Sequence, residues 1–349
     1  MNSTSALLPR AIDALASRQD LSAEETGEAL AEIMSGNASD VQIAAFLIAL
    51  RTKGETVDEL AGLARTMRRF AAAVPVSHDR LVDTAGTGGG RRTFNVSTTA
   101  ALIAAGAGCI VAKHGNRSAT GLSGSADVLE ALGARIDLTP EAVARCIEEV
   151  GFGFMFAPAH HQATRYVVPV RAQLAVRTSF NFLGPLTNPA GAPRQLIGVA
   201  DPAYLERMAG ALALLGTEHA LVVSSHDGLD ELSISAPSHV VEVLDGEISS
   251  YDVAPADVGL AVAPAEEVPG GDPQQNADTV RRIFSGETGP TRPARDLAVL
   301  NAGAAIYAGG GAPTLADGVT AAQAAVDSGA AAAALQRFVS ATQRLAPSP

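Results

Sequence analysis

Short apolar runs that alternate with helix-forming segments dominate the chain from Leu81 onward. The runs at 110–112, 154–156, 196–199 and 220–223 have the length and composition of buried strands. Alternation of this kind predicts an α/β fold with a central, mostly parallel sheet flanked by helices. Ligands of open sheets bind beyond the carboxyl ends of the strands, so we expect the functional site at that edge.

A different pattern fills the first 75 residues. Ser22, Ser39 and Thr56 are each followed, three positions later, by glutamate or glutamine, which is the capping-box signature of a helix start. The predicted helices run to about residue 35, to the residue before Gly54, and to about residue 72. This part of the chain is expected to be a small helical domain.

The length of 349 residues and the apolar content of 47% allow two domains, or one large domain with a full core. We predict a small all-helical domain over 1–75, with a contribution from about 168–188. The remaining segments, 78–167 and 189–346, are predicted to form a large α/β domain.

Composition disfavours several functional classes of protein. The formal net charge of −12 and the pI near 5.0 disfavour a nucleic-acid binder or an anionic-membrane binder. Cys109 and Cys146 sit in apolar patterns and indicate no disulfide framework. Neither a signal peptide nor an apolar run of membrane-spanning length is visible, so we expect a cytoplasmic protein with no membrane and no nucleic-acid partner.

The stretch from Asp83 to Asp127 is basic and rich in glycine, although the chain as a whole is acidic. It holds no acidic residue between those two aspartates, but three arginines and Lys113. A narrow basic stretch of this kind indicates a site for an anionic small molecule, whereas nucleic acid needs a wider basic face.

Two loops carry this stretch. The first, at 86–90, is rich in glycine, and its backbone N–H groups can turn toward an anion as in a phosphate nest. Asn95, Ser97 and Thr98 stand where a helix over about 97–105 begins, and their polar groups suit phosphate or ribose oxygens. The alternative interpretation is a flexible turn followed by an ordinary N-cap at Ser97.

The second loop follows the strand-like run at 109–112 and begins at Lys113, one of two lysines in the chain. Lysine is a compact charge that suits a flexible phosphate. A further helix opens at 123–125 and directs more N–H and hydroxyl groups to the same place. Neither loop has the spacing of a dinucleotide fingerprint or of a Walker A motif.

Asp230 and Glu231 follow the apolar run at 221–223. Adjacent carboxylates after a strand suit Mg²⁺, which prefers hard oxygen ligands and keeps waters that phosphate oxygens can replace. A solvated acidic turn is the alternative. His160 and His161 are adjacent and would point about 100° apart on a helix, so we expect them to be structural or substrate-lining, without a metal role.

Several motifs occur together and in order: GTGG at 86–89, TFN-x-ST at 93–98, KHGNRS at 113–118, SGSAD at 123–127, RT-x-FN-x-LGPLTNPA at 177–190 and GLDE at 228–231. Over nearly its whole length the chain thereby resembles the anthranilate phosphoribosyltransferase family of tryptophan biosynthesis. The resemblance implies a homodimer that transfers phosphoribose from phosphoribosyl pyrophosphate (PRPP) to the amine of anthranilate in the presence of Mg²⁺. The products would be N-(5-phosphoribosyl)anthranilate and diphosphate, with no side chain required as nucleophile or base.

The resemblance also implies that the large α/β domain over 78–167 and 189–346 binds the phosphoribosyl group, and it implies roles for individual residues. Ser97, Asp230 and Glu231 match the magnesium ligands, and Gly86, Asn116 and Arg171 match the anthranilate path, with Gly184 nearby. The residues that match the PRPP site are Gly86, Gly89, Gly90, Thr93, Asn95, Val96, Ser97, Thr98, Lys113, His114, Gly115, Asn116, Arg117, Ser118, Ala119, Thr120, Gly121 and Ser125.

One loop departs from the family pattern. The family writes GTGG-D-G-x-x-TFN, whereas this chain writes GTGG-Gly90-Arg91-Arg92-TFN, which is one residue shorter and lacks the aspartate. We expect Arg91 or Arg92 to contact the diphosphate and the dependence on magnesium to be altered. Two other functions remain as alternatives: a nucleoside phosphorylase-like enzyme, and a non-catalytic relative that binds nucleic acid.

Overall fold

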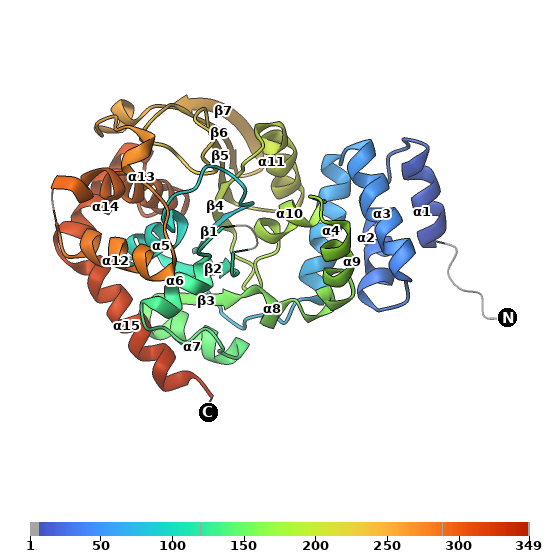
Figure 1. Ribbon diagram of the computed structural model, residues 1–349, viewed down its shortest axis with the longest axis horizontal. Helices are drawn as coiled ribbons and strands as arrows, with labels where there is room; N and C mark the ends of the chain where they lie inside the picture. Colours follow the sequence, from blue (N-terminus) through green and yellow to red (C-terminus); the bar gives the residue numbers. More distant parts are fainter. Residues whose placement is uncertain (1–6, 119–120, 288, 348–349) are drawn as a thin grey trace.

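The computed structural model describes residues 7–118, 121–287 and 289–347. It confirms the predicted fold class, because a helical N-terminal part lies beside a larger part built on one seven-stranded, mostly parallel sheet (Figure 1). Across these described ranges, no helix combines the length and the apolar character needed to cross a bilayer.

The N-terminal helices start where their caps predict. Their bounds are α1 Leu7–Ala16, α2 Ala23–Met34, α3 Asp40–Lys53 and α4 Val57–Phe70. The side chains of Ser22, Ser39 and Thr56 each accept a hydrogen bond from the backbone N–H three residues on, so all three predicted capping boxes form. The last helix ends at Phe70 instead of about residue 72, because Ala71 adopts an extended backbone (φ −74°, ψ 146°).

The sheet has the strand order β3-β2-β1-β4-β5-β6-β7. Its strands are β1 Leu81–Gly86, β2 Ile110–Gly115, β3 Phe152–Phe156, β4 Arg194–Gly198, β5 His219–Ser225, β6 Ser238–Leu244 and β7 Glu247–Val253. The first five strands run parallel, and the four predicted runs lie in β2 to β5. The antiparallel pair β6–β7 was not predicted from the sequence.

Strand β1 lies at the point where the strand order reverses. The chain moves outward on one side of it through β2 and β3, then returns to place β4 on its other side. Ligands of open α/β sheets bind at such a switch point, beyond the carboxyl ends of the strands. We therefore expect the functional site at the loops that follow β1, β2, β4 and β5.

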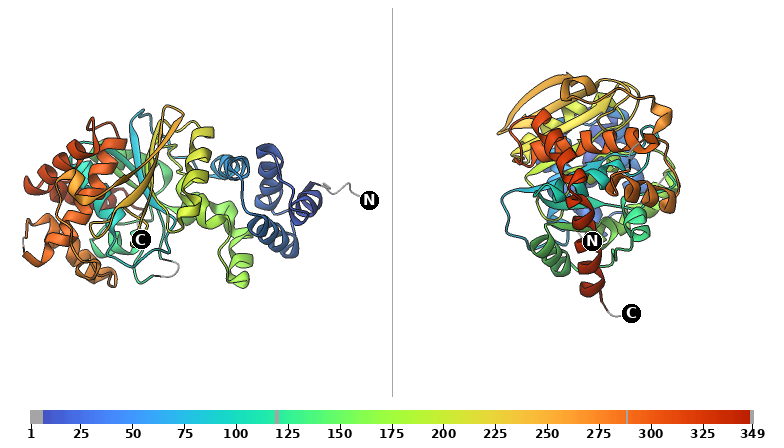
Figure 2. Two further views of the ribbon diagram at one scale, coloured as in Figure 1. Left: turned by 90° about the horizontal axis from the view of Figure 1, so that it is seen from above. Right: turned by 90° about the vertical axis from the view of Figure 1, so that its left-hand side faces the viewer.

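Helices cover both faces of the sheet (Figure 2). Those after β1 are α5 Val96–Gly106, α6 Ser125–Ala131, α7 Pro140–Val150, α8 Ala157–His160, α9 Val168–Leu174, α10 Phe180–Leu183, α11 Leu205–Leu214, α12 Pro273–Phe284, α13 Arg292–Ala308, α14 Leu315–Asp327 and α15 Ala330–Leu345. Short 3-10 segments lie at Gln162–Tyr166, Gly184–Leu186, Pro202–Tyr204, Pro255–Val258, Ala265–Glu267 and Gly289–Thr291. One core joins the sheet to α5, α13, α14 and α15 on one face.

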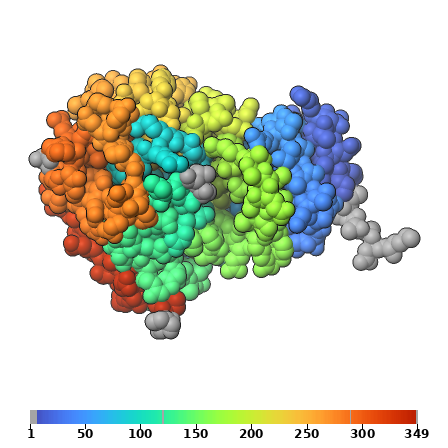
Figure 3. Space-filling view, viewed as in Figure 1, coloured from blue at the N-terminus to red at the C-terminus, as the bar shows by residue number. Residues whose placement is uncertain are grey.

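A second core runs from the other face of the sheet into the N-terminal helices. It joins α1 to α4 with α11 and with buried side chains of β4, β5 and β6. The segment that contains α9 and α10 belongs to this core, because α9 contacts α3 and α10 contacts α4. In the space-filling view this green segment lies between the blue helices and the rest of the molecule (Figure 3).

Three buried histidines lie where these parts meet. His160 Nδ1 is 3.0 Å from the carbonyl oxygen of Ala72, and the rings of His114 and His161 have centroids 5.0 Å apart. Burial lowers the pKa of His114 to about 3 and that of His161 to about 4, and it also lowers the pKa of His160. All three rings are therefore neutral in the folded protein near pH 7.

We expect the protein to lose stability on acidification below about pH 6.5, the ordinary histidine pKa. A histidine whose folded pKa is depressed contributes its full stability above the unfolded pKa, and that stability is lost as pH falls toward the folded value. The loss is up to about 1.4 kcal/mol per pH unit for each such histidine. Calorimetric melting between pH 7.5 and 4.5 measures the slope, which His161→Asn should flatten and His78→Asn, at an exposed position, should not. Equal slopes in both variants would contradict the assignment.

Candidate functional site

The glycine loop follows β1 at the centre of the sheet. Gly86 is the last residue of β1 and pairs in register with Gly198, the last residue of β4. Gly88 and Gly89 have φ of 65° and 94°, in the left-handed region that favours glycine. The loop can therefore take a backbone path that other residues resist.

Asp230 lies directly against this loop. A methyl group on Gly86 would be 3.6 Å from Asp230 Oδ2, and one on Gly90 would be 2.7 Å from the Asp230 backbone nitrogen. One on Gly198 would overlap the Asp230 carbonyl oxygen. Three glycines thus make room for the aspartate. The structure brings the predicted metal ligand and the predicted phosphate loop together.

Glu231 lies next to the start of α5. The backbone N–H of Ser97 donates to Glu231 Oε1 at 3.2 Å. Burial raises the pKa of Glu231 well above its ordinary value, and the neighbouring Asp230 raises it further. The predicted magnesium ligands Ser97, Asp230 and Glu231 therefore converge on one place.

These three residues fit a magnesium ion. The described residues contain no group of three or more histidine, cysteine or acidic side chains suited to a metal, so an ion here would rest on two carboxylates and a hydroxyl. Mg²⁺ takes one or two carboxylates and completes its shell with water and substrate phosphate. A cation bound between these two buried carboxylates would favour their charged forms.

Lys113 is buried beneath the site and is only 1% exposed. Its ammonium group donates to the carbonyl oxygen of Thr84, to Thr84 Oγ1 at 3.1 Å and to Ser97 Oγ at 3.4 Å. Burial lowers its pKa to about 8, and the charges of Asp83 and Glu231 oppose that shift. In this structure the lysine joins β1 to the start of α5 instead of extending into solvent toward a phosphate.

The second loop is folded onto acidic residues of α6. Arg117 pairs with Asp127 at 2.7 Å and with Glu130 at 2.6 Å, so its charge is already compensated. The Ser118 backbone N–H donates to Asp127 Oδ2 at 3.2 Å, and its hydroxyl accepts from the Gly121 N–H at 2.6 Å. The predicted residues Ala119 and Thr120 lie outside the described residues.

Three predicted residues, His114, Gly115 and Asn116, lie at the end of β2 and directly after it. The side-chain oxygen of Asn116 accepts from the Arg117 N–H at 2.7 Å. A methyl group on Gly115 would be 3.0 Å from Ser125 Cβ, so the start of α6 closely approaches the strand end. His114 Nδ1 lies 3.2 Å from the Gly184 carbonyl oxygen, which places Gly184 beside this loop.

Asn95 is the N-cap residue of α5, although its side chain makes no capping hydrogen bond, so Ser97 lies inside the helix and is not its N-cap. Asn95 Oδ1 accepts hydrogen bonds from Ser123 Oγ at 2.9 Å and from Asn276 Nδ2 at 2.8 Å. It therefore links the first loop to the second loop and to α12. Sequence reasoning missed Asn276, because no local pattern places α12 beside the loop.

The other α5 and loop residues divide between core and surface. Val96 and Thr98 are fully buried, and the Thr98 hydroxyl has no hydrogen-bond partner, so this side chain faces the interior instead of an open site. The half-buried Thr93 donates a hydrogen bond from its hydroxyl to the carbonyl oxygen of Phe94 at 3.1 Å.

Two arginines approach from the α9–α10 segment. Arg171 in α9 donates to Asn181 Oδ1 at 3.3 Å and lies over the ring of Phe180, 5.5 Å from its centroid. Arg177 donates to the Gly88 carbonyl oxygen at 3.2 Å, and a methyl group on Gly89 would be 2.5 Å from its Nη1. Arg177 was not among the predicted site residues, although it opens one of the recognised motifs.

The Arg91 side chain contacts other parts of the protein. Its Nη2 lies 3.1 Å from Asp227 Oδ2, and its Nη1 donates to the Ala265 carbonyl oxygen at 3.0 Å. Both outer nitrogens of the Arg91 guanidinium are engaged by the protein, and the expectation that Arg91 or Arg92 contacts the diphosphate stays a prediction.

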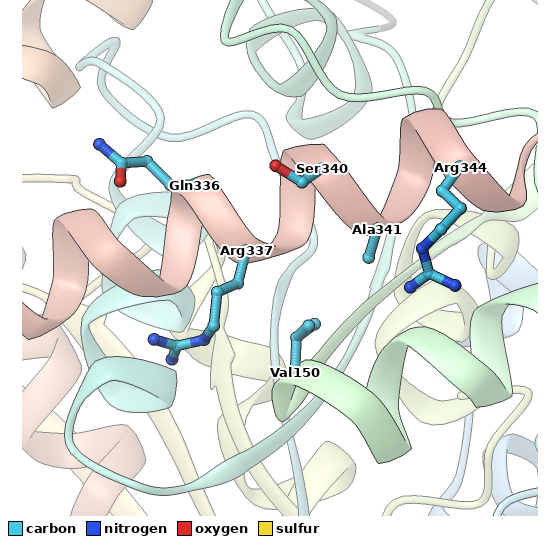
Figure 4. A pocket seen from close by; sticks show the side chains of 6 residues that line it. All are labelled: Val150, Gln336, Arg337, Ser340, Ala341 and Arg344. Carbon is cyan, nitrogen blue, oxygen red and sulfur yellow. The ribbon is translucent and has the colours of Figure 1, made fainter.

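A surface depression of about 310 Å³ lies elsewhere, between α7 and α15. Figure 4 shows Arg337, Ala341 and Arg344 projecting from α15 toward Val150 at the end of α7. Arg344 forms an ion pair with Glu149. The lining contains none of the predicted site residues, so we place the functional site at the glycine loop.

Known proteins share the sequence and the fold of this chain. Residues 9–71 match the helical bundle domain of the glycosyl transferase family, and residues 78–332 match its a/b domain. An anthranilate phosphoribosyltransferase of Rubrobacter xylanophilus is 53% identical over 341 residues, which is 97% of this chain and 99% of the relative. The crystal structure of the Thermus thermophilus anthranilate phosphoribosyltransferase matches with a TM-score of 0.89 at 44% identity, covering 95% of this chain and 99% of that one. The Saccharomyces cerevisiae enzyme in complex with PRPP and Mg also matches with a TM-score of 0.89, at 27% identity over 98% of this chain and 99% of that one.

Proposed function

The chain belongs to the anthranilate phosphoribosyltransferase family, and from this premise we propose how its residues carry out the reaction. The enzyme transfers the phosphoribosyl group of PRPP to the amine of anthranilate, giving N-(5-phosphoribosyl)anthranilate and diphosphate in tryptophan biosynthesis. One observation carries the assignment of the site. The glycine loop after β1, Ser97 at the start of α5, and the adjacent carboxylates Asp230 and Glu231 meet at the switch point of the sheet.

PRPP is proposed to lie on the two loops after β1 and β2. Backbone N–H groups from Gly86 to Gly90 and the first turn of α5 favour negative charge on the diphosphate. The loop from Asn116 to Ser118 and Ser125 would face the phosphoribosyl end. Lys113 contributes its positive charge from below, through Thr84 and Ser97.

Mg²⁺ is the proposed metal, held by Ser97, Asp230 and Glu231 together with substrate oxygens. When bound, it would neutralise charge on the diphosphate oxygens. This proposal is supported by the hard oxygen donors of the site and by the magnesium in the yeast complex.

Anthranilate is proposed to approach from the α9–α10 side, past Asn116, Arg171 and Gly86. The Arg171 guanidinium is partly buried, which lowers its pKa but leaves it charged, so it offers a cation for the carboxylate of the acceptor. Gly184, beside His114, would form part of the same path.

The reaction needs little proton chemistry from the protein. The aromatic amine is neutral at pH 7, and its nitrogen attacks C1 of the ribose while the bond from C1 to the diphosphate oxygen breaks. The transition state resembles an oxocarbenium ion, as in glycoside cleavage. After the new N–C1 bond has formed, the extra proton on the amine nitrogen passes to solvent water, and diphosphate leaves with the electron pair of the broken C1–O bond. The residues of the site therefore act by aligning the two substrates and stabilising charge on the leaving group.

The enzyme is further proposed to be a homodimer in the cytoplasm, with a helical domain over 1–75 and 168–188 and an α/β domain over 78–167 and 189–346. An apolar face on α3 supports self-association. Val41 is 78% exposed, and Ala44, Ala45 and Ile48 on the same helix are only half-buried. Sedimentation velocity of the wild type and Val41→Glu would test the dimer.

Anthranilate fluorescence provides the direct test of activity. We expect it to fall when the purified protein is mixed with PRPP and Mg²⁺, and to stay nearly constant when EDTA removes the metal. Product identity is checked by mass spectrometry. A phosphate-dependent cleavage of nucleosides without loss of anthranilate would instead support the phosphorylase-like alternative, which the comparisons do not favour.

A further inference from the structure

The shortened loop after β1 is fastened to the turn that carries the acidic pair. The Arg91 backbone N–H donates to the Gly228 carbonyl oxygen at 2.8 Å. The Arg91 guanidinium pairs with Asp227 at 3.1 Å, with the two side chains 23% and 17% exposed. A partly buried ion pair and a backbone hydrogen bond therefore hold the same two segments together.

Asp227 organises the turn from within. Its carboxylate accepts hydrogen bonds from the hydroxyl of Ser225 and from Ser233 Oγ, the latter at 2.8 Å, and from the Leu229 N–H at 3.3 Å. Gly228, with φ of 80°, lets the chain reverse directly after it. The carboxylate is thus a fixed anchor three residues before Asp230.

The other end of the arginine reaches a third segment. Arg91 Nη1 donates to the carbonyl oxygen of Ala265 at 3.0 Å. Beside this contact, a methyl group on Gly270 would be 2.5 Å from the Thr93 carbonyl oxygen, so the 265–270 segment lies closely against the loop. One guanidinium therefore joins the loop after β1, the turn after β5 and the segment before α12.

We propose that Arg91 and Asp227 form a positioning clamp that sets the placement of Asp230 and Glu231 against the glycine loop. Gly90, which precedes Arg91, is the residue on which Asp230 rests. A change in the clamp therefore moves the metal-binding carboxylates relative to the phosphate-binding loop. Arg91 acts through Asp227 and not by contact with the diphosphate. The inference rests on the proposed function, because it concerns the binding of PRPP with Mg²⁺ at this site.

The test combines Arg91→Gln, Asp227→Asn and the double variant. Isothermal titration calorimetry measures PRPP affinity at a series of Mg²⁺ concentrations, and steady-state kinetics gives kcat and KM. PRPP affinity is expected to rise with Mg²⁺ concentration to a maximum. We expect each single variant to need about tenfold more Mg²⁺ than the wild type to reach half of that maximal affinity. The double variant should be no worse than either single one, because the pair acts as a unit. Arg91→Lys should restore part of the affinity.

Arg282→Gln is the matched control. Arg282 lies on α12 and forms an exposed ion pair with Glu287, so this variant also removes an arginine from an ion pair. It should leave the Mg²⁺ dependence unchanged, and thermal melting confirms that every variant folds. Additive losses that are equal at all Mg²⁺ concentrations would overturn the clamp and favour direct phosphate contact by Arg91. Unchanged single variants would overturn it as well. If the wild type neither binds PRPP nor consumes anthranilate, the proposed function fails and the clamp fails with it.

Discussion

Replacing Asp230 with asparagine and Glu231 with glutamine together should lower kcat/KM by at least about 10³-fold, since losing even one preorganised charge-stabilising group costs roughly 10² to 10³. Both carboxylates lie against the glycine loop and the start of α5, where the diphosphate is proposed to leave. Their loss removes the only acidic ligands proposed for the metal. Continuous anthranilate fluorescence at saturating Mg²⁺ measures the effect.

An adjacent acidic pair on α7 provides the control. Glu148 and Glu149 both lie on the surface, and their double replacement by glutamine should keep activity within about twofold, as surface ion pairs contribute little. No single side chain should control the pH–rate profile as an essential general base. Retained activity in the Asp230/Glu231 double variant, with normal folding, would contradict the proposed site.

Gly198→Ala should destabilise the protein by at least about 3 kcal/mol, at the upper end of the cost of overpacking. The added methyl group would overlap the Asp230 carbonyl oxygen and lie 2.8 Å from its carbonyl carbon. Both neighbours are backbone atoms, so neither can rotate away as a side chain would. Chemical denaturation followed by circular dichroism measures the free energy of unfolding.

Gly184→Ala is the control for stability. That glycine has an ordinary helical backbone (φ −50°, ψ −55°), and nothing lies within 4 Å of an added methyl group. Its free energy of unfolding should stay within about 1 kcal/mol of the wild type, as for a replacement without strain. A Gly198→Ala variant as stable as this control would mean that the turn after β5 can move away without loss.

Local signals predicted much of the fold. The capping boxes at Ser22, Ser39 and Thr56 need only four consecutive residues, and all three form. The buried strands β2 to β5 are short apolar runs, which sequence reveals directly. The β6–β7 hairpin had a signal that was overlooked: Asp245 and Gly246 form its turn with φ of 50° and 86°.

The details of the site were harder to predict, because the sequence shows where charged residues stand but not which groups they pair with. Lys113 and Arg117 were predicted as cations for phosphate. In the structure Lys113 is buried and donates to Thr84, and Arg117 is paired with Asp127 and Glu130. Asn276 reaches Asn95 across 181 positions of the sequence, a pairing that only the tertiary fold creates.

The second core, shared by the N-terminal helices and one face of the sheet, limits how the protein can be dissected. A fragment that ends near Phe70 would lose Val170, Phe182 and Leu183, which complete its apolar interior. It would then expose that interior to water, the condition under which isolated fragments aggregate. The helical bundle domain of the family matches only residues 9–71. Chimeras made between relatives should nevertheless exchange the α9–α10 segment together with the first four helices.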